Sequence, residues 1–398
     1  MKKKLLLLLS VMLFGCQFGN QKLNTDDLDV INLTKSYPKK EIRLQDIANI
    51  EYIPLETTDD VLLGSTSFLF HVCDKYILVR DGAQGIFVFS RNGKIISHFN
   101  RRGQGDKEYI QLGAVIFDEK NEELFVKDES MKYRFLVYSI SGEYKRTVKY
   151  SDDLLITGNN VCNFDDETLL VYEEYRWFSD DNSEKPYLLL SKQDGSVVTT
   201  LNINLPVRYS YRQTQVIDPG GGRENIYTSL SFPVSNSWYY GEDFVITDIS
   251  SDTIYRLSKD RNLTPMLVHT PSVHSSEPRK VWSTLLTTDK FIVLWKFTLD
   301  FRALEQQGPT VPEFALLHEF ETGETSEVTF VNDDYTTRKW TPAGRLAPAS
   351  AKNMDIQLIQ VPRLKAALEE KQLKGDLEKL VATLDEDDNP VVMIVKFK

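Results

Sequence analysis

The chain has 398 residues and a formal net charge of −11, because 58 acidic side chains outnumber 47 basic ones. This balance argues against nucleic acid or an anionic bilayer surface as the main partner, since a phosphate-binding face needs clustered lysine and arginine. Only three cysteines are present. A disulfide-stapled scaffold is therefore excluded, and the core must be held by burial of apolar side chains.

The first sixteen residues have the pattern of a lipoprotein signal peptide. Three lysines precede an apolar run over residues 5–14, and the run ends at Gly15-Cys16. A membrane-spanning helix needs roughly twenty apolar residues, so this run is too short to be one. We predict that the chain is cleaved before Cys16 and that lipid on Cys16 is its only contact with the membrane. The alternative is an ordinary signal peptide with an incidental cysteine.

Residues 17–40 are polar and are predicted to tether the following domain away from the lipid. Gln17 stands where an aspartate retains some bacterial lipoproteins at the inner membrane. We therefore expect an outer-membrane lipoprotein, and the sequence leaves both orientations open, towards the periplasm and towards the cell exterior.

From residue 41 onward the pattern is strand-like almost throughout, with short β-branched and aromatic runs closed by Gly, Asn or Asp turns. Two adjacent stretches repeat: Val79 and Val126 are 47 residues apart, and Gly93 and Gly142 are 49 apart. Each unit reads as strand, Asp-containing loop, strand, tight Gly turn and strand. This pattern is typical of one blade of a β-propeller.

Weaker copies of the unit follow over residues 168–195, 244–257 and 291–323, which makes five blades. A sixth is predicted from the two ends, because the strands at residues 50–55 and 391–397 have no repeat partner. Pairing them would close the ring and remove two exposed sheet edges, with Pro54 at a strand end or outer edge. We therefore predict an all-β, six-bladed β-propeller over residues 41–398, closed by N- and C-terminal strands.

A short helical segment is predicted near the C-terminus, over residues 362–384. Five leucines have helical spacing, and Gly375 is expected to break the segment into a hairpin. We expect it to pack against the propeller; a partner-binding helix is the alternative. The leucines are Leu364, Leu368, Leu377, Leu380 and Leu384.

Several motifs resemble the six-bladed β-propeller lipoproteins of Gram-negative bacteria, which are similar to NHL-like and TolB-like propellers. The resemblance covers essentially the whole mature chain and implies the same fold, but it carries no catalytic residue set. The chain departs from the family pattern at Asp106-Lys107, where the family usually has Pro-Gly. The matching motifs are Ile-Pro-Leu-Glu-Thr at 53–57, Leu-Gly-Ser at 63–65, residues 86–94, the loop at 101–109, Asp-Asn-Pro-Val at 388–391 and Lys-Phe-Lys at 396–398.

The sequence predicts neither a metal site nor a cofactor. His269 and His274 are five residues apart, which does not place them on one helix face, and the other three histidines are scattered. No nucleophile elbow, phosphate loop or Cys-x-x-Cys pair is present. Enzymatic activity is therefore not supported. Cys73 and Cys162 fall in different blades and are predicted not to form a disulfide.

Candidate ligand-binding residues lie in loops that a propeller gathers at one end of its ring. Aromatic rings stack on sugar or peptide planes and guanidinium groups bind carboxylates, so such a face suits an anionic sugar, a peptide or a protein loop. Bracing of long loops is the alternative role. The candidates are Arg101, Arg102, Tyr109, Arg176, Trp177, Arg208, Tyr209, Tyr211, Arg212 and Trp282.

Three functions are compatible with these features. The favoured one is a non-catalytic, envelope-anchored lipoprotein whose loop face binds a glycan, peptide or envelope protein. The second is a propeller enzyme of the lyase or hydrolase type with an active site at the mouth of the channel. The third is a structural subunit of a membrane complex.

Overall fold

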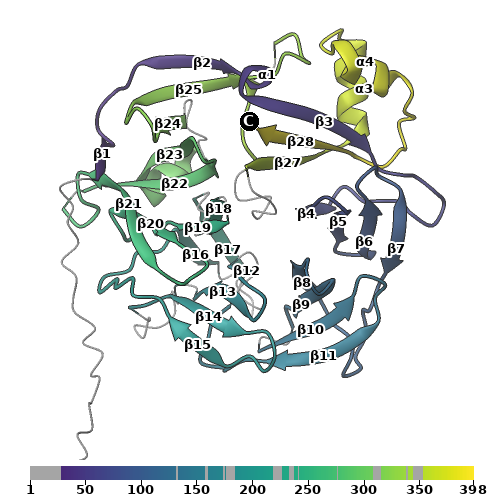
Figure 1. Cartoon of the computed structure of the whole chain (residues 1–398), viewed down its shortest axis with the longest axis horizontal. Helices are drawn as coiled ribbons and strands as arrows, with labels where there is room; N and C mark the ends of the chain where they lie inside the picture. The colour runs from purple at the N-terminus through teal and green to yellow at the C-terminus, as the bar shows by residue number, and fades with distance from the viewer. Residues whose placement is uncertain are drawn as a thin grey trace, which may run out of the picture.

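The computed structural model shows six blades arranged in a ring (Figure 1), which confirms the predicted all-β, six-bladed propeller. It describes residues 28–130, 133–156, 160–173, 175, 184–217, 226–232, 237–240, 242–275, 277–307, 315–337, 339–343 and 353–398.

Blades 1 to 3 are each a sheet of four antiparallel strands in chain order. Their first strands pack against one another around the centre of the ring. Blade 1 contains β4 (Phe68–Val72), β5 (Tyr76–Asp81), β6 (Gly85–Ser90) and β7 (Ile95–Phe99). Blade 2 contains β8 (Leu112–Asp118), β9 (Glu123–Asp128), β10 (Arg134–Ser139) and β11 (Tyr144–Lys149). Blade 3 contains β12 (Val161–Asn163), β13 (Thr168–Tyr172), β14 (Tyr187–Ser191) and β15 (Val197–Thr200).

Blades 4 and 5 follow the same meander but carry additional elements. Blade 4 contains β18 (Ser237–Tyr240), β19 (Asp243–Ile246), β20 (Thr253–Leu257) and β21 (Leu263–Thr270). Blade 5 contains β22 (Arg279–Thr287), β23 (Phe291–Leu299), β24 (Ala315–Glu319) and β25 (Thr325–Val331), to which β26 (Lys339–Trp340) also pairs. The hairpin of β16 (Arg212–Ile217) and β17 (Ile226–Ser231) lies in the chain between blades 3 and 4, and α2 (Phe301–Gln307) lies between β23 and β24.

The N-terminal segment runs along the outer edges of blades 4 and 5 (Figure 1). Strand β1 (Asp29–Asn32) pairs in parallel with β21, and β2 (Lys39–Arg43) pairs in parallel with β25. Ile31 and Leu33 are buried there. The expectation of a tether reaching residue 40 is therefore wrong for the described part of this segment, because its apolar side chains add to the propeller core.

The ring is closed by strands from both ends of the chain, as predicted. After the short helix α1 (Leu44–Ile47), β3 (Ala48–Pro54) pairs antiparallel with β28 (Val391–Phe397), so that Ile53 lies opposite Val392. Pro54 is the last residue of an edge strand, in the position expected for a residue without an amide donor. Strand β27 (Met354–Ile359), which the sequence did not predict, completes blade 6 on the other side of β28.

The short helical segment near the C-terminus is also confirmed. Helices α3 (Val361–Glu369) and α4 (Gly375–Ala382) form a hairpin, and α4 begins at the glycine that was expected to interrupt it. Leu364, Leu377 and Val381 are buried in the apolar cluster shared by blades 5 and 6. In the part of the chain that the structure describes, no helix is long and apolar enough to cross a membrane.

Gly93 connects blade 1 to the closing strand. It has φ +84° in the β6–β7 turn, and an added Cβ would lie 2.2 Å from the carbonyl oxygen of Pro54. We expect Gly93→Ala to lower the free energy of unfolding by about 1–3 kcal/mol, because both the backbone conformation and the close approach disfavour a side chain. Denaturant unfolding of the purified protein measures this change.

Gly82→Ala is the matched control for this substitution. A Cβ at Gly82 would meet no atom within 4 Å, so the change should alter stability by no more than about 0.5 kcal/mol. Equal stability of the two variants would contradict a structural role for Gly93.

Candidate binding site

The predicted residues between blades 1 and 2 mainly brace their own loop. The Tyr109 side chain is buried, and its hydroxyl accepts a hydrogen bond from the Arg101 amide at 3.0 Å. The Arg101 guanidinium donates to the Gly142 carbonyl of blade 2 at 2.8 Å. Arg102 donates to the Ile110 carbonyl at 3.2 Å but remains exposed. Arg101 is exposed as well, so a ligand could reach both arginines but not the buried Tyr109 ring.

Two of the predicted residues after blade 3, Arg208 and Tyr209, make separate contacts between a guanidinium group and an aromatic ring. Arg208 donates to the Tyr172 hydroxyl at 2.9 Å and lies between the Tyr172 and Tyr175 rings, 5.4 and 5.8 Å from their centroids. The Arg279 guanidinium lies 4.2 Å from the centroid of the Tyr209 ring. These contacts hold Tyr209 at the start of the long connection to blade 4.

Three predicted aromatic residues do not present their rings for stacking on a ligand. Trp282 was expected in a loop after blade 4, but it lies in β22 and is fully buried, as are most atoms of Tyr109 and Tyr211. These rings fill the core instead. Arg212 is exposed, with its guanidinium 5.8 Å from the Tyr211 ring centroid. Cys16, Arg176 and Trp177 lie outside the described residues.

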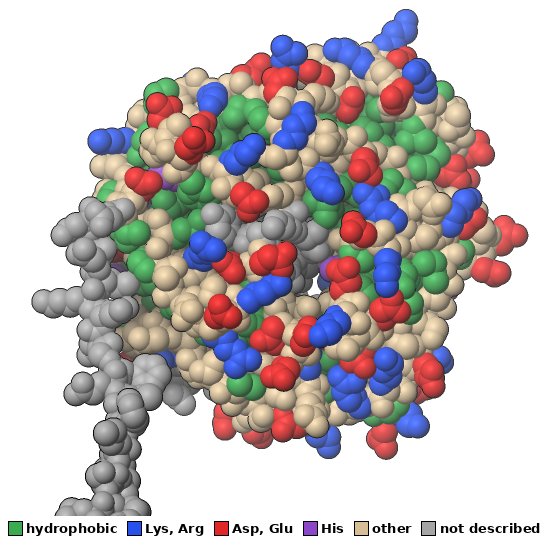
Figure 2. All heavy atoms as spheres, in the orientation of Figure 1, with side chains coloured by type: hydrophobic (Ala, Val, Ile, Leu, Met, Phe, Trp, Pro, Cys, Tyr) green, Lys and Arg blue, Asp and Glu red, His purple; other side chains and the backbone are tan. Residues whose placement is uncertain are grey.

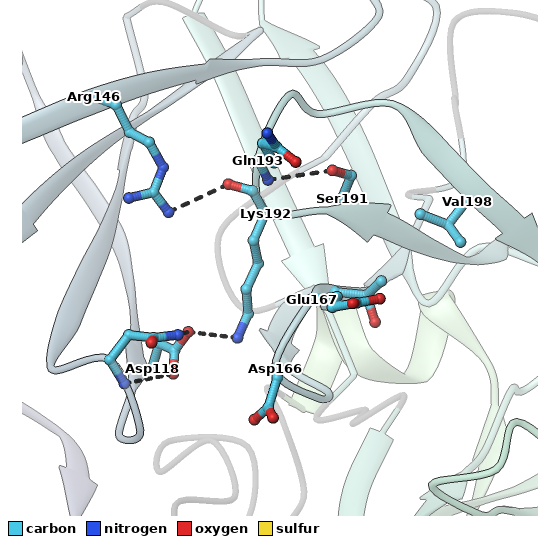
Figure 3. A pocket seen from close by; sticks show the side chains of 10 residues that line it. Asp118, Arg146, Asp166, Glu167, Ser191, Lys192, Gln193 and Val198 are labelled. Carbon is cyan, nitrogen blue, oxygen red and sulfur yellow. Dashed lines mark hydrogen bonds and ion pairs between the residues drawn. The ribbon is translucent and has the colours of Figure 1, made fainter.

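A depression that the sequence did not predict lies on the end of the ring opposite to the loops that carry the predicted residues. We call this end the turn face; it carries the β8–β9, β12–β13 and β14–β15 turns. A pocket of about 410 Å³ lies between blades 2 and 3 (Figure 3), and it shares Asp118, Asp166 and Glu167 with a second pocket of about 760 Å³. We call the two together the blade 2–3 depression. Gln193, Lys192 and Arg146 also line it.

The floor of the depression is a buried ion pair between blades 2 and 3. Lys192 and Asp118 are 4% and 1% exposed, and the Lys192 ammonium lies 2.6 Å from the Asp118 carboxylate. The same ammonium donates to the Asp165 carbonyl, and Asn121 donates to Asp118. Burial alone would raise the pKa of Asp118, but the hydrogen bonds from Lys192 and Asn121 outweigh burial and lower this pKa.

The rim of the depression is polar and exposed. Arg146 forms a two-pronged pair with Glu123 at 2.9 and 2.8 Å and also donates to the Lys192 carbonyl, which fixes one wall. Asp166 pairs with Lys120 across the two blades. The carboxylate of Glu167 makes no hydrogen bond or ion pair with the residues that the structure describes. Glu167 is therefore available to a ligand.

The wider part of the depression is acidic. Its lining includes five carboxylates and three lysines, which gives a formal charge of −2. On the end of the ring that Figure 2 shows, acidic and basic side chains are interspersed instead of separated into patches. Because Arg146 and Lys192 line the narrower pocket, the depression as a whole has no net formal charge, and it offers both acceptors and donors to a polar ligand.

Sequence reasoning missed these residues because acidic residues in turns are usually solvated. Asp118 is the last residue of the first strand of blade 2, and Asp165 follows the first strand of blade 3 by two residues. Both residues lie near the first turn of a blade, and only this shared position in the repeat indicates that they meet on the turn face.

The chain matches one known protein family over almost its whole length. The family described as Domain of unknown function (DUF4934) matches residues 28–396. This chain belongs to that family. No curated protein matches the sequence.

Two solved structures from Bacteroides resemble this member of the family. A protein from Bacteroides fragilis that is described as exported has 13% identity and a TM-score of 0.59, over 93% of this chain and 99% of that one. A member of the DUF4221 family from Bacteroides vulgatus has 9% identity and a TM-score of 0.47, over 88% of this chain and 97% of that one. At this identity, the first comparison supports the fold alone.

Proposed function

We propose that this protein is a non-catalytic binding protein of the cell envelope, anchored at the outer membrane by lipid on Cys16, which holds a polar ligand in the blade 2–3 depression. The observation that carries the proposal is the combination of a rigid floor and a free rim. The buried Asp118–Lys192 pair fixes the floor, while Glu167 and Gln193 are exposed above it. A binding site that is already formed loses little entropy when it takes its ligand.

The location in the envelope rests on the sequence. The basic, apolar and Gly-Cys segments of residues 1–16 have the order of a lipoprotein signal peptide. The description of the Bacteroides fragilis protein as exported supports the same compartment.

The chemistry of the lining favours a glycan or a peptide as the ligand. Carboxylates accept hydrogen bonds from sugar hydroxyl groups and from ammonium groups, and the Gln193 amide both donates and accepts. Val198, which is 45% exposed at the same rim, offers an apolar contact to the face of a sugar ring or to a side chain. The depression therefore suits a ligand that is polar on one side and partly apolar on the other.

Replacing both Glu167 and Gln193 by alanine should weaken ligand binding at least tenfold. A hydrogen bond to a charged group contributes about 1.5–3 kcal/mol, and a tenfold change in affinity corresponds to about 1.4 kcal/mol. Arrays of cell-wall oligosaccharides and of lysine-containing peptides, probed with the unmodified chain and the double variant, measure this effect.

Glu143→Ala is the matched control, because Glu143 is an exposed carboxylate in the β10–β11 turn that does not line the depression. It should bind as the unmodified chain does. Undiminished binding by the Glu167→Ala, Gln193→Ala variant would place the ligand elsewhere.

The loop face is the second candidate site, favoured by the ring stack of Tyr209 and Arg279. Arg102→Ala combined with Arg212→Ala removes two exposed guanidinium groups from this side of the ring. An anionic oligosaccharide or peptide that loses affinity for this variant alone would identify the loop face as the binding surface.

A further inference from the structure

Three side chains with metal-binding chemistry meet on the turn face between blades 1 and 2. His71 lies in β4, Cys73 directly follows that strand, and Glu119 lies in the β8–β9 turn. One nitrogen, sulfur or oxygen atom from each lies within 4.8 Å of the others. We propose that these three residues bind a divalent transition metal ion and that their ligand atoms favour Zn²⁺.

The local structure directs the imidazole of His71 into this cluster. The pairing of β4 with β5 is irregular between Leu69 and His71, and such bulges change the direction in which a side chain points. The ring edge packs against Phe117, with the centroids 5.1 Å apart. The orientation of the ring is thus set by the backbone and by one aromatic neighbour.

The imidazole has an unused ligand atom. His71 Nε2 is buried and has no hydrogen-bond partner among the described residues; it lies 3.9 Å from Glu119 Oε2, which is beyond hydrogen-bonding distance. A buried polar atom without a partner costs free energy. A metal ion between the imidazole and the carboxylate would remove this cost.

Cys73 supplies the ligand that determines the metal class. The Cys73 side chain is almost fully buried, at 7% exposure, and it faces the cluster with one sulfur atom. A bound metal ion would replace the thiol proton. Sulfur, imidazole nitrogen and carboxylate oxygen together form a typical zinc ligand set, whereas Mg²⁺ and Ca²⁺ prefer oxygen ligands alone.

The distances require only small adjustments of the ligand side chains, because the three ligand atoms lie within 4.8 Å of one another. Zinc–ligand bonds of about 2.0–2.3 Å at tetrahedral angles place ligand atoms roughly 3.3–3.8 Å apart. The Glu119 side chain is 54% exposed, so it can rotate towards the other two.

The site would have a coordination position open to the depression. Glu119 and Lys75 line the wider pocket of about 760 Å³. The Lys75 ammonium is paired with Glu122 at 3.1 Å, which reduces its repulsion of a cation. Three protein ligands with one open position are typical of zinc sites that bind water or a ligand donor. This goes beyond the proposed glycan or peptide binding, which does not require a metal.

Cobalt provides a direct test in the unmodified protein. The full chain, purified with a chelator and a reductant and then freed of the chelator, is titrated with Co²⁺. We expect one Co²⁺ per chain and a thiolate-to-cobalt charge-transfer band in the near ultraviolet, which Zn²⁺ then abolishes. Saturation with Co²⁺ without this band would overturn the proposal.

Substitutions assign the band to this site. Cys73→Ser and, independently, Glu119→Gln should each weaken Co²⁺ binding at least tenfold; the second changes an exposed side chain and does not depend on core packing. Cys162→Ser is the matched control, because Cys162 is a partly buried thiol in the first strand of blade 3. Loss of the band in Cys162→Ser, or its retention in Cys73→Ser, would contradict the assignment.

Discussion

Replacing Lys192 by methionine should lower the free energy of unfolding by about 3–5 kcal/mol, the usual cost of leaving one member of a buried ion pair without its partner. The Lys192 ammonium lies 2.6 Å from the Asp118 carboxylate, and both side chains are almost fully buried. Methionine keeps the length and apolar stem of lysine but removes the charge. Guanidinium unfolding at pH 7, followed by tryptophan fluorescence, measures the loss.

Two further variants separate the ion pair from general effects of the substitution. Adding Asp118→Asn to Lys192→Met removes the uncompensated charge and should recover most of the lost stability. Lys379→Met breaks an ion pair with Asp376 whose side chains are 79% and 97% exposed, and it should change stability little. A loss in Lys192→Met no larger than that in Lys379→Met would mean that the buried pair does not stabilise the two blades.

The propeller was predictable because each blade is a local structure. Strand, turn and strand follow one another within one repeat, so Gly93 and Gly142 appear at equivalent places and both have positive φ in the structure. Closure was predictable for a different reason. In the sequence, strands β3 and β28 have no partner within a repeat, and a ring with open sheet edges would be unfavourable.

The N-terminal strands were not predictable in the same way. Strand β1 is only four residues long, and its parallel partner β21 lies far along the chain. The pairing depends on the outer edge that blade 4 presents once it has folded. A polar sequence pattern alone therefore suggested a tether over residues that belong to the propeller.

Residue type predicted which side chains could bind a ligand but not which of them are exposed. Trp282 and Tyr211 have the chemistry of a stacking platform, yet both are buried. Trp282 lies in β22, which begins earlier than the sequence predicted, and Tyr211 packs in an apolar cluster with Phe232. The cluster of His71, Cys73 and Glu119 shows the opposite case. The repeat of 47 residues between Val79 and Val126 places the turn after Cys73 beside the turn that contains Glu119, so the repeat could have indicated this contact.

The contribution of Asp355 to the free energy of unfolding should fall by roughly 3–4 kcal/mol as the pH rises from about 4 to about 7. Asp355 lies in β27 and is 5% exposed. Burial raises its pKa from 3.8 to about 7, against the lowering effect of hydrogen bonds from Gln357 and the Ala343 amide. Within this pH window the folded protein holds a proton that the unfolded chain has lost, so raising the pH favours unfolding.

Asp355→Asn removes the titration while an amide of the same shape remains. Relative to the unmodified chain, the unfolding free energy of this variant should rise between pH 5 and pH 8, and at pH 8 it should be the more stable protein. Burial also raises the pKa of Asp334, but this carboxyl is present in both proteins, and the difference between their profiles therefore isolates Asp355. Denaturant unfolding at pH 5, 6, 7 and 8 measures both profiles. Parallel profiles would mean that Asp355 titrates in the folded state as it does in the unfolded chain.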